Sequence, residues 1–194
     1  MKKVKKIGII YDGETEEIIF KSATLKDVLG ASNIQSVGEY KYQSGKIKIY
    51  SESLKNKGAE KIVIVTDMEQ LPCYTEVKKR FNANESLSDI HEIIIVKRMA
   101  EAWFIADTKT MKKILRKGSK EKLNYAPETY NNPYNKLCEI ISQNSNNKEK
   151  KRSSKVKLAK QFIDNGFSVV NAANHSKCSS AKYFLKKLKA ISKS

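Results

Sequence analysis

Residues 62–66, with the sequence IVIVT, indicate the fold class, because so short a run of apolar, mostly β-branched residues predicts a strand buried on both faces. A second run of this kind, IGIIY, occupies residues 7–11, and a third, EIIIV, occupies residues 92–96. Buried strands that alternate with helical segments are typical of a parallel sheet with helices on both faces. The sequence therefore predicts an α/β fold with a mostly parallel sheet.

The segments between these strands carry helical spacing or turn residues. Helices are expected over residues 18–29, where Gly30 would supply the C-terminal cap, over residues 51–58 and over residues 74–82. Residues 35–50 are expected to contain two short extended pieces.

From Arg98 onward the apolar residues recur at helical spacing, and a polar, charged loop is expected over residues 143–154. A chain of 194 residues is long enough for one domain of ordinary size. We therefore expect a single domain over residues 1–194, in which an α/β core over residues 1–97 carries a mainly helical extension over residues 98–194.

The charge of the chain is concentrated in its second half. The formal net charge is +17, of which residues 1–97 contribute +2 and residues 98–194 contribute +15. The excess lies in three basic blocks at residues 109–122, 148–160 and 177–193. Such a field attracts polyanions, so nucleic acid is the expected partner; the alternative is an ordinary solvated, lysine-rich surface. With four arginines in the chain, bidentate reading of bases is not expected.

Composition also bounds the location of the protein. No apolar run approaches the roughly 20 residues of a membrane-spanning helix, and the apolar stretch after the basic N-terminus is too short for a signal peptide. Three cysteines without CxxC spacing argue against a disulfide framework and are interpreted as small buried residues. A cytoplasmic protein without membrane association is expected.

Carboxylates follow two of the predicted strands. Asp12 and Glu16 lie four residues apart at a helix start, and Asp67 and Glu69 lie two apart on an extended segment, so each pair shares a face. The carboxyl ends of parallel strands are where open α/β sheets bind ligands. Four converging carboxylates repel one another unless a hard divalent cation such as Mg²⁺ or Mn²⁺ lies among them. These four residues are therefore the predicted metal ligands.

Each of these residues also has a purely structural interpretation. Asp12 could cap the helix that follows it, and Asp67 could be an ordinary turn residue. Glu101 lies in an almost wholly apolar helix, where it either joins the metal site or forms an ion pair with Arg98 or a neighbouring lysine. Lys155 either stabilises charge on a phosphoryl group or is a solvated lysine among many.

Three stretches resemble Toprim domains. Residues 9–16, IIYDGETE, resemble the first Toprim motif, and residues 63–69, VIVTDME, resemble the second, in which Asp-x-Asp follows a strand. Residues 98–107, RMAEAWFIAD, are similar to the Glu-x-Trp-Leu-x-x-Asp stretch of the small DUF4276-type Toprim proteins. Residues 176–188 loosely resemble the C-terminal pattern of the same proteins.

The resemblance implies a Rossmann-like Toprim core and a magnesium-dependent nuclease, like the Toprim nuclease domain of the overcoming-lysogenisation-defect nucleases. It further implies a role in anti-phage defence and a protein partner such as an ATPase. Asp12 and Glu16 match the first acidic pair, and Asp67 and Glu69 match the second. Toprim proteins usually have Glu in place of Asp12 and Asp in place of Glu69; metal ligation tolerates such a shift better than catalysis does.

Three functions are therefore compared. The first is a metal-dependent nuclease that cuts DNA or RNA with little sequence specificity, in which Glu16, Asp67 and Lys155 are the catalytic residues. The second is a catalytically decayed Toprim-like module that binds nucleic acid or regulates a partner. The third is a phosphatase or phosphotransferase that uses the same carboxylates on small molecules.

Overall fold

The structure is a computed structural model that describes residues 4–68, 71, 73–84, 87–115, 125–144 and 153–194. The strands are β1 (Lys5–Tyr11), β2 (Ile34–Lys41), β3 (Lys61–Asp67) and β4 (His91–Val96). The helices in the first half are α1 (Glu14–Lys21), α2 (Ala23–Ala31), α3 (Ile47–Asn56) and α4 (Tyr74–Asn84). Those in the second half are α5 (Glu101–Ala106), α6 (Thr108–Ile114), the 3-10 turn η1 (Pro127–Thr129), α7 (Pro133–Gln143), α8 (Lys155–Asp164), α9 (Val169–Ala173) and α10 (Ser179–Ile191).

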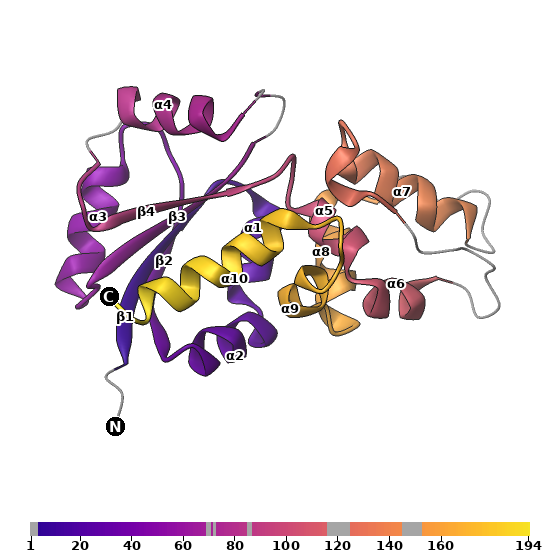
Figure 1. Cartoon of the computed structure of the whole chain (residues 1–194), viewed down its shortest axis with the longest axis horizontal. Helices are drawn as coiled ribbons and strands as arrows, with labels where there is room; N and C mark the ends of the chain where they lie inside the picture. Colours follow the sequence, from indigo (N-terminus) through magenta and orange to yellow (C-terminus); the bar gives the residue numbers. More distant parts are fainter. Residues whose placement is uncertain (1–3, 69–70, 72, 85–86, 116–124, 145–152) are drawn as a thin grey trace.

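The four strands form one sheet in the order β2-β1-β3-β4, and every recorded pairing is parallel. Helices α3 and α4 cover one face of the sheet, while α2 and α10 lie on the other (Figure 1). The predicted α/β fold with a parallel sheet is confirmed, and its Rossmann-like character follows from this layering.

Alternate residues of β1, β3 and β4 enter two separate hydrophobic clusters. Ile7 and Ile9 of β1 belong to the cluster shared with α1, α2, α5 and α10, whereas Ile10 belongs to the cluster shared with α3 and α4. Because successive side chains point to opposite faces, a strand buried on both faces must be apolar at nearly every position. This requirement explains the continuous apolar runs in the sequence.

The helical second half shares its core with the sheet. Helix α10 returns across the sheet, where the ring of Phe184 lies 5.8 Å from that of Phe20 and 5.4 Å from that of Trp103. The Trp103 indole donates a hydrogen bond of 2.8 Å to Ser180 Oγ. One hydrophobic cluster therefore runs from the first half of the chain into the second.

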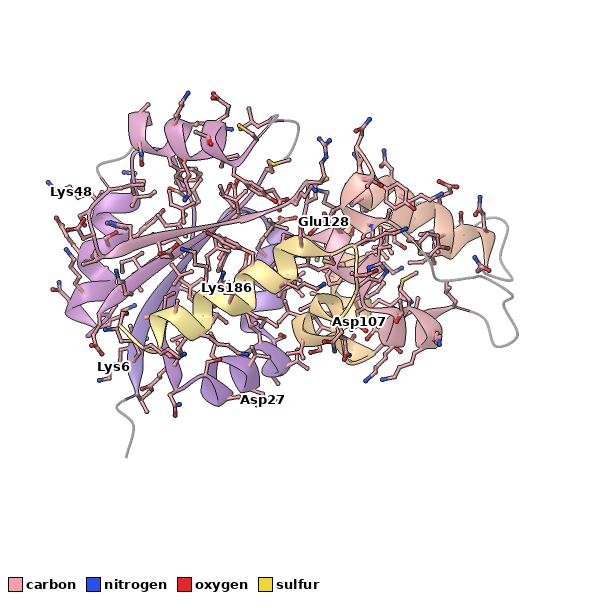
Figure 2. All side chains as sticks on the ribbon, viewed as in Figure 1. Lys6, Asp27, Lys48, Asp107, Glu128 and Lys186 are labelled. Atoms are coloured by element: carbon pink, nitrogen blue, oxygen red, sulfur yellow. The ribbon has the colours of Figure 1, made fainter. Side chains whose placement is uncertain are left out.

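Two buried carboxylates hold this helical half together (Figure 2). Asp107 caps α6: it accepts hydrogen bonds from the backbone and hydroxyl groups of Thr110 and from the backbone N–H of Ser168. Glu128 caps α10: it accepts from the backbone and hydroxyl groups of Ser179 and from the backbone N–H of Ser180. Each carboxylate thus receives three hydrogen bonds, so its burial is compensated.

Two local predictions are wrong. Residues 35–50 contain one strand, β2, and the start of α3, because Ile47, Ser51 and Leu54 present a buried face at helical spacing. The helix expected over residues 18–29 is two helices that break at Ser22, whose backbone is extended and whose hydroxyl caps α2. Gly30 lies inside α2 rather than at its cap; the left-handed residue of that turn is Asn33, with φ of 55°.

The interpretation of the cysteines as buried residues holds for one of the three. Cys178 is buried, and burial raises the pKa of its thiol to about 12, whereas Cys138 is half-buried and Cys73 is exposed.

Among the helices of the described ranges, none is long and apolar enough to cross a bilayer.

Gly8 allows α3 to approach β1 closely, which leads to a stability prediction. A Cβ atom at Gly8 would lie 2.6 Å from Leu54 Cδ1 and 2.9 Å from Leu54 Cβ. Gly8→Ala is therefore expected to lower the free energy of unfolding by about 2 kcal/mol through overpacking. Denaturant unfolding would measure the loss. Gly30→Ala is the matched control: nothing lies within 4 Å of its Cβ position, so a gain of roughly 0.5–1 kcal/mol is expected. Equal stability of the two variants would contradict the prediction.

Candidate functional site

The predicted site lies where the connections from two neighbouring strands diverge. After β1 the chain passes through α1 and α2 on one face of the sheet, and after β3 it passes through α4 on the other. Such a switch point leaves a crevice at the carboxyl ends of the two strands. Asp12 and Asp67 lie there, and the backbone N–H of Asp12 donates a hydrogen bond of 3.2 Å to the carbonyl of Val65 in β3.

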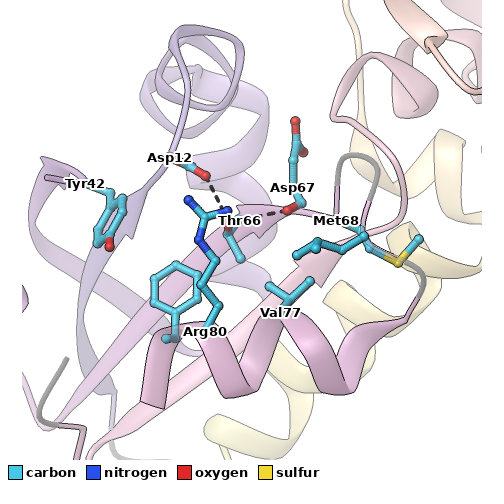
Figure 3. Close-up of a pocket in the computed structure, with 9 residues that line it drawn as sticks. Asp12, Tyr42, Thr66, Asp67, Met68, Val77 and Arg80 are labelled. Carbon is cyan, nitrogen blue, oxygen red and sulfur yellow. Dashed lines mark hydrogen bonds between the residues drawn. The ribbon is translucent and has the colours of Figure 1, made fainter. Parts of the chain in front are cut away.

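Asp12 has a side-chain partner across the switch point. Its Oδ2 accepts a hydrogen bond of 3.0 Å from Thr66 Oγ1 (Figure 3). The N-cap of α1 is Gly13, which has no side chain to cap the helix. The alternative interpretation of Asp12 as a helix cap is therefore wrong, and its carboxylate faces β3.

Gly13 leaves the space that Glu16 occupies. A Cβ atom at position 13 would lie 2.3 Å from Glu16 Oε2, although the backbone of Gly13 has an ordinary extended conformation. Glu16 is buried in the first turn of α1. The glycine of the DGETE stretch is therefore needed for close approach of a carboxylate rather than for a left-handed turn.

Glu16 and Asp67 form a contacting carboxyl pair. Burial raises the pKa of Glu16, and the nearby carboxylates Glu101 and Asp12 act in the same direction. Burial also raises the pKa of Asp67 well above its ordinary value, with Glu16 as the next largest cause. A hydrogen bond between two carboxyl groups requires one proton, so without a cation the pair is expected to share one.

Glu101 joins the same cluster from the helical half of the chain. It is the first residue of α5, is buried, and accepts a hydrogen bond of 2.8 Å from Thr15 Oγ1. Its Oε1 lies 3.6 Å from Lys155 Nζ. Glu101 thus forms an ion pair with a lysine, but that lysine comes from a distant helix rather than from the neighbouring sequence, and a place for Glu101 in the metal site stays a prediction.

Lys155 is the first residue of α8, where Ser154 caps the helix. Its side chain is 43% exposed, and its Nζ lies 5.7 Å from the centre of the Tyr134 ring. The positive charge of Lys155 acts to lower the pKa of Asp67, against the larger effect of burial. The structure thus brings Lys155 to the carboxylate cluster, and its catalytic role stays a prediction.

Three oxygen atoms of the cluster lack a hydrogen-bond donor. Glu16 Oε1, Asp67 Oδ1 and Glu101 Oε2 are shielded from solvent, and within the described residues none accepts a hydrogen bond as a carboxylate. Buried polar atoms are nearly always satisfied, so such exceptions call for an explanation. A proton or a cation would satisfy them.

The metal site itself is not preformed. Within the ranges that the structure describes, no three His, Cys, Asp or Glu side chains are grouped so that they could hold a metal ion. Of the four predicted ligands, Glu16 and Asp67 contact each other at the switch point and Asp12 lies near enough to Glu16 to raise its pKa, whereas Glu69 lies outside the described residues. The donor set nevertheless fits a hard cation, because it consists of carboxylate oxygens, two of them without a donor.

A small cavity adjoins the carboxylates on the side of α4. Its volume is about 120 Å³. The lining combines two aspartates, a threonine, a tyrosine, an arginine and apolar residues: Asp12, Tyr42, Thr66, Asp67, Met68, Leu71, Val77, Arg80 and Phe81. Sequence analysis missed Arg80; the available signal was its position on the first helix after β3, between the apolar residues Val77 and Phe81.

Of the three basic blocks, residues 116–122 and 148–152 lie outside the described residues, and the described lysines lie largely on exposed helix faces. Exposed lysines occur on α6, α8 and α10; Lys186 on α10 is labelled in Figure 2. Some of these lysines have structural partners. Lys113 donates a hydrogen bond of 2.9 Å to the carbonyl of Asn165, and Lys187 Nζ lies 2.7 Å from Glu92 Oε1 in an ion pair. Both the polyanion-binding and the solvated-surface interpretations remain open.

Comparison of the chain with protein-family models, with curated proteins and with solved structures found no match.

Proposed function

We propose that the protein is a divalent-metal-dependent phosphodiesterase that cleaves nucleic acid in the manner of Toprim nucleases. The observation that carries the proposal is the contrast between two kinds of buried carboxylate in one chain. Asp107 and Glu128 each receive three hydrogen bonds, whereas Glu16, Asp67 and Glu101 each keep an oxygen that no described residue donates to. Carboxylates that serve the fold are satisfied by it, and those left unsatisfied favour a ligand.

In this proposal Asp12, Glu16 and Asp67 hold Mg²⁺ or Mn²⁺. The bound ion would supply Lewis-acid stabilisation of phosphate charge and a water of lowered pKa. Thr66 keeps the Asp12 carboxylate directed toward β3 through its 3.0 Å hydrogen bond. Thr15 and Lys155 orient Glu101 at the edge of the cluster. Lys155, half exposed beside Asp67, would meet the negative charge of a substrate phosphate.

The basic second half, with its net charge of +15, would hold the nucleic-acid backbone without reading its sequence. The Toprim relationship, the cytoplasmic location, the anti-phage role and the ATPase partner stay predictions that rest on sequence features or on the resemblance.

The test uses the wild-type protein on supercoiled plasmid and on structured RNA, each with Mg²⁺, Mn²⁺ or EDTA. We expect nicking or degradation with either ion and none in EDTA. We also expect binding measured in Ca²⁺ to weaken steeply between about 50 and 200 mM salt, because lysines displace counterions from phosphates. A Glu16→Gln protein purified in parallel controls for contaminating nucleases.

One observation favours the non-catalytic alternative, namely that no group of three ligating side chains in the described ranges is arranged for a metal. The same experiment separates the two functions. Binding of nucleic acid without cleavage under either ion would contradict the nuclease and favour the regulatory module. Hydrolysis of a small phosphodiester without affinity for polyanions would favour the third function.

A further inference from the structure

The cavity beside the carboxylates is too small for a whole nucleotide. Pockets that enclose drug-sized ligands measure about 300–1,000 Å³, whereas this cavity measures about 120 Å³. A single tetrahedral group such as a phosphate is of a size that it can accept. Asp12 and Asp67 line one side of the cavity and α4 lines the other, and the Asp12 carboxylate faces the cavity, so a group bound in it would lie beside a proposed metal ligand.

Arg80 extends from α4 into this space. Figure 3 shows its guanidinium directed toward Asp12 and Thr66, across the cavity from the helix that carries it. Within the described part of the chain the guanidinium makes no hydrogen bond or ion pair, and Asp12 Oδ2 is already bound by Thr66. No described residue therefore occupies any of the five N–H donors of Arg80, and all five can bind a ligand.

Packing of α4 determines where Arg80 points. Val77 and Phe81, which flank it on the helix, are 2% and 6% exposed in the cluster beneath α4. The Phe81 ring lies 5.2 Å from the Tyr42 ring, which closes the apolar end of the cavity. With both neighbours held in the core, α4 cannot rotate to carry Arg80 away from the carboxylates.

Charge explains why a cation is useful here. Asp12, Glu16 and Asp67 together repel an anionic substrate, and one divalent ion offsets only part of that charge. A guanidinium offers paired N–H donors whose geometry matches two phosphate oxygens. Lys155 of α8 contacts the carboxylate cluster at Glu101, on the side of α5. Arg80 supplies the positive charge on the α4 side.

We propose that Arg80, with the cavity it lines, forms a phosphate-binding subsite that seats a substrate phosphate beside Asp12. The assignment of that phosphate to a nucleic acid rests on the proposed function. Binding of the phosphate group itself does not depend on it. Arg80 acts by contact with the substrate, whereas Val77 and Phe81 only position it.

The test is titration of inorganic phosphate into the full-length protein in the presence of Mg²⁺, followed by ³¹P NMR or calorimetry. Arg80→Gln is expected to weaken phosphate binding at least about tenfold, and Arg80→Lys to weaken it less, since charge is kept but the paired donors are lost. Lys79→Gln is the matched control: it removes one positive charge from the same helix, where Lys79 is exposed and paired with Glu76 at 3.1 Å. It should change binding less than twofold.

The outcomes distinguish this subsite from the proposed function. Phosphate binding by Arg80→Gln within twofold of wild type, or no binding by wild type, would overturn the subsite even if wild type cleaves nucleic acid. If wild type does not cleave nucleic acid but loses phosphate binding on Arg80→Gln, the nuclease is wrong and the subsite stands. Thermal unfolding should be unchanged in all three variants, because both side chains are exposed.

Discussion

Asp67→Asn is expected to abolish metal-dependent cleavage and, at the same time, to stabilise the metal-free protein. The carboxamide carries no charge, so the metal-free protein no longer has to bind a proton at this buried pair to avoid repulsion between Glu16 and Asp67. Its N–H₂ group also donates a hydrogen bond without a shared proton. The same substitution deprives the proposed metal of a charged ligand.

The expected magnitudes are large for activity and moderate for stability. Cleavage should fall at least about a thousandfold, which is typical of losing a residue that acts within a catalytic unit. The free energy of unfolding in EDTA should rise by about 1–2 kcal/mol, which raises Tm by roughly 2–8 °C in a chain of this size. Plasmid nicking and thermal unfolding measure the two effects.

Asp27→Asn provides the matched control for this substitution. Asp27 is an exposed residue of α2, so the same chemical change should leave cleavage intact and stability within about 0.5 kcal/mol. Wild-type cleavage by Asp67→Asn would refute the site assignment. A destabilised Asp67→Asn protein would instead show that the carboxylate serves the fold.

Glu128→Ala is expected to lower the free energy of unfolding by about 3–4 kcal/mol. The carboxylate accepts three hydrogen bonds at the start of α10, of 2.9 Å and 2.6 Å from Ser179 and of 2.6 Å from Ser180. Hydrogen bonds to a charged group contribute about 1.5–3 kcal/mol each, and its loss leaves buried donors without partners. Ser180 Oγ also accepts a hydrogen bond from the Trp103 indole N–H, so the substitution also disturbs the hydrophobic core around Trp103.

Denaturant unfolding of Glu128→Ala and of Glu139→Ala checks this prediction. Glu139 is an exposed residue of α7 whose ion pair with Lys136, at 2.9 Å, is screened by solvent and contributes little to stability. Glu139→Ala should therefore unfold at nearly the same denaturant concentration as wild type. Comparable stability of the two variants would contradict the structural role of Glu128.

The strands were the most predictable part of the fold. Residues 7–11, 62–66 and 92–96 form the central strands β1 and β3 and the edge strand β4, because burial on both faces imposes an uninterrupted apolar run. The sequence did not predict the bounds of strand β2 at the other edge. Most of its residues are only half-buried, and Glu39 and Lys41 interrupt its apolar pattern. The break at Ser22 was missed because apolar periodicity continues across it.

By itself the sequence determined the α/β class, the parallel sheet and the placement of Asp12 and Asp67 at strand ends. These follow from local properties: hydrophobic period, turn residues, and the rule that parallel strands end at one edge. Only the tertiary structure decided the partners: Glu101 meets Thr15, 86 residues away, and Glu128 meets Ser179, 51 residues away. It alone set Arg80 across a cavity from the carboxylates. Contacts of this kind depend on how the helices pack over the sheet. No short stretch of sequence contains both residues of such a contact.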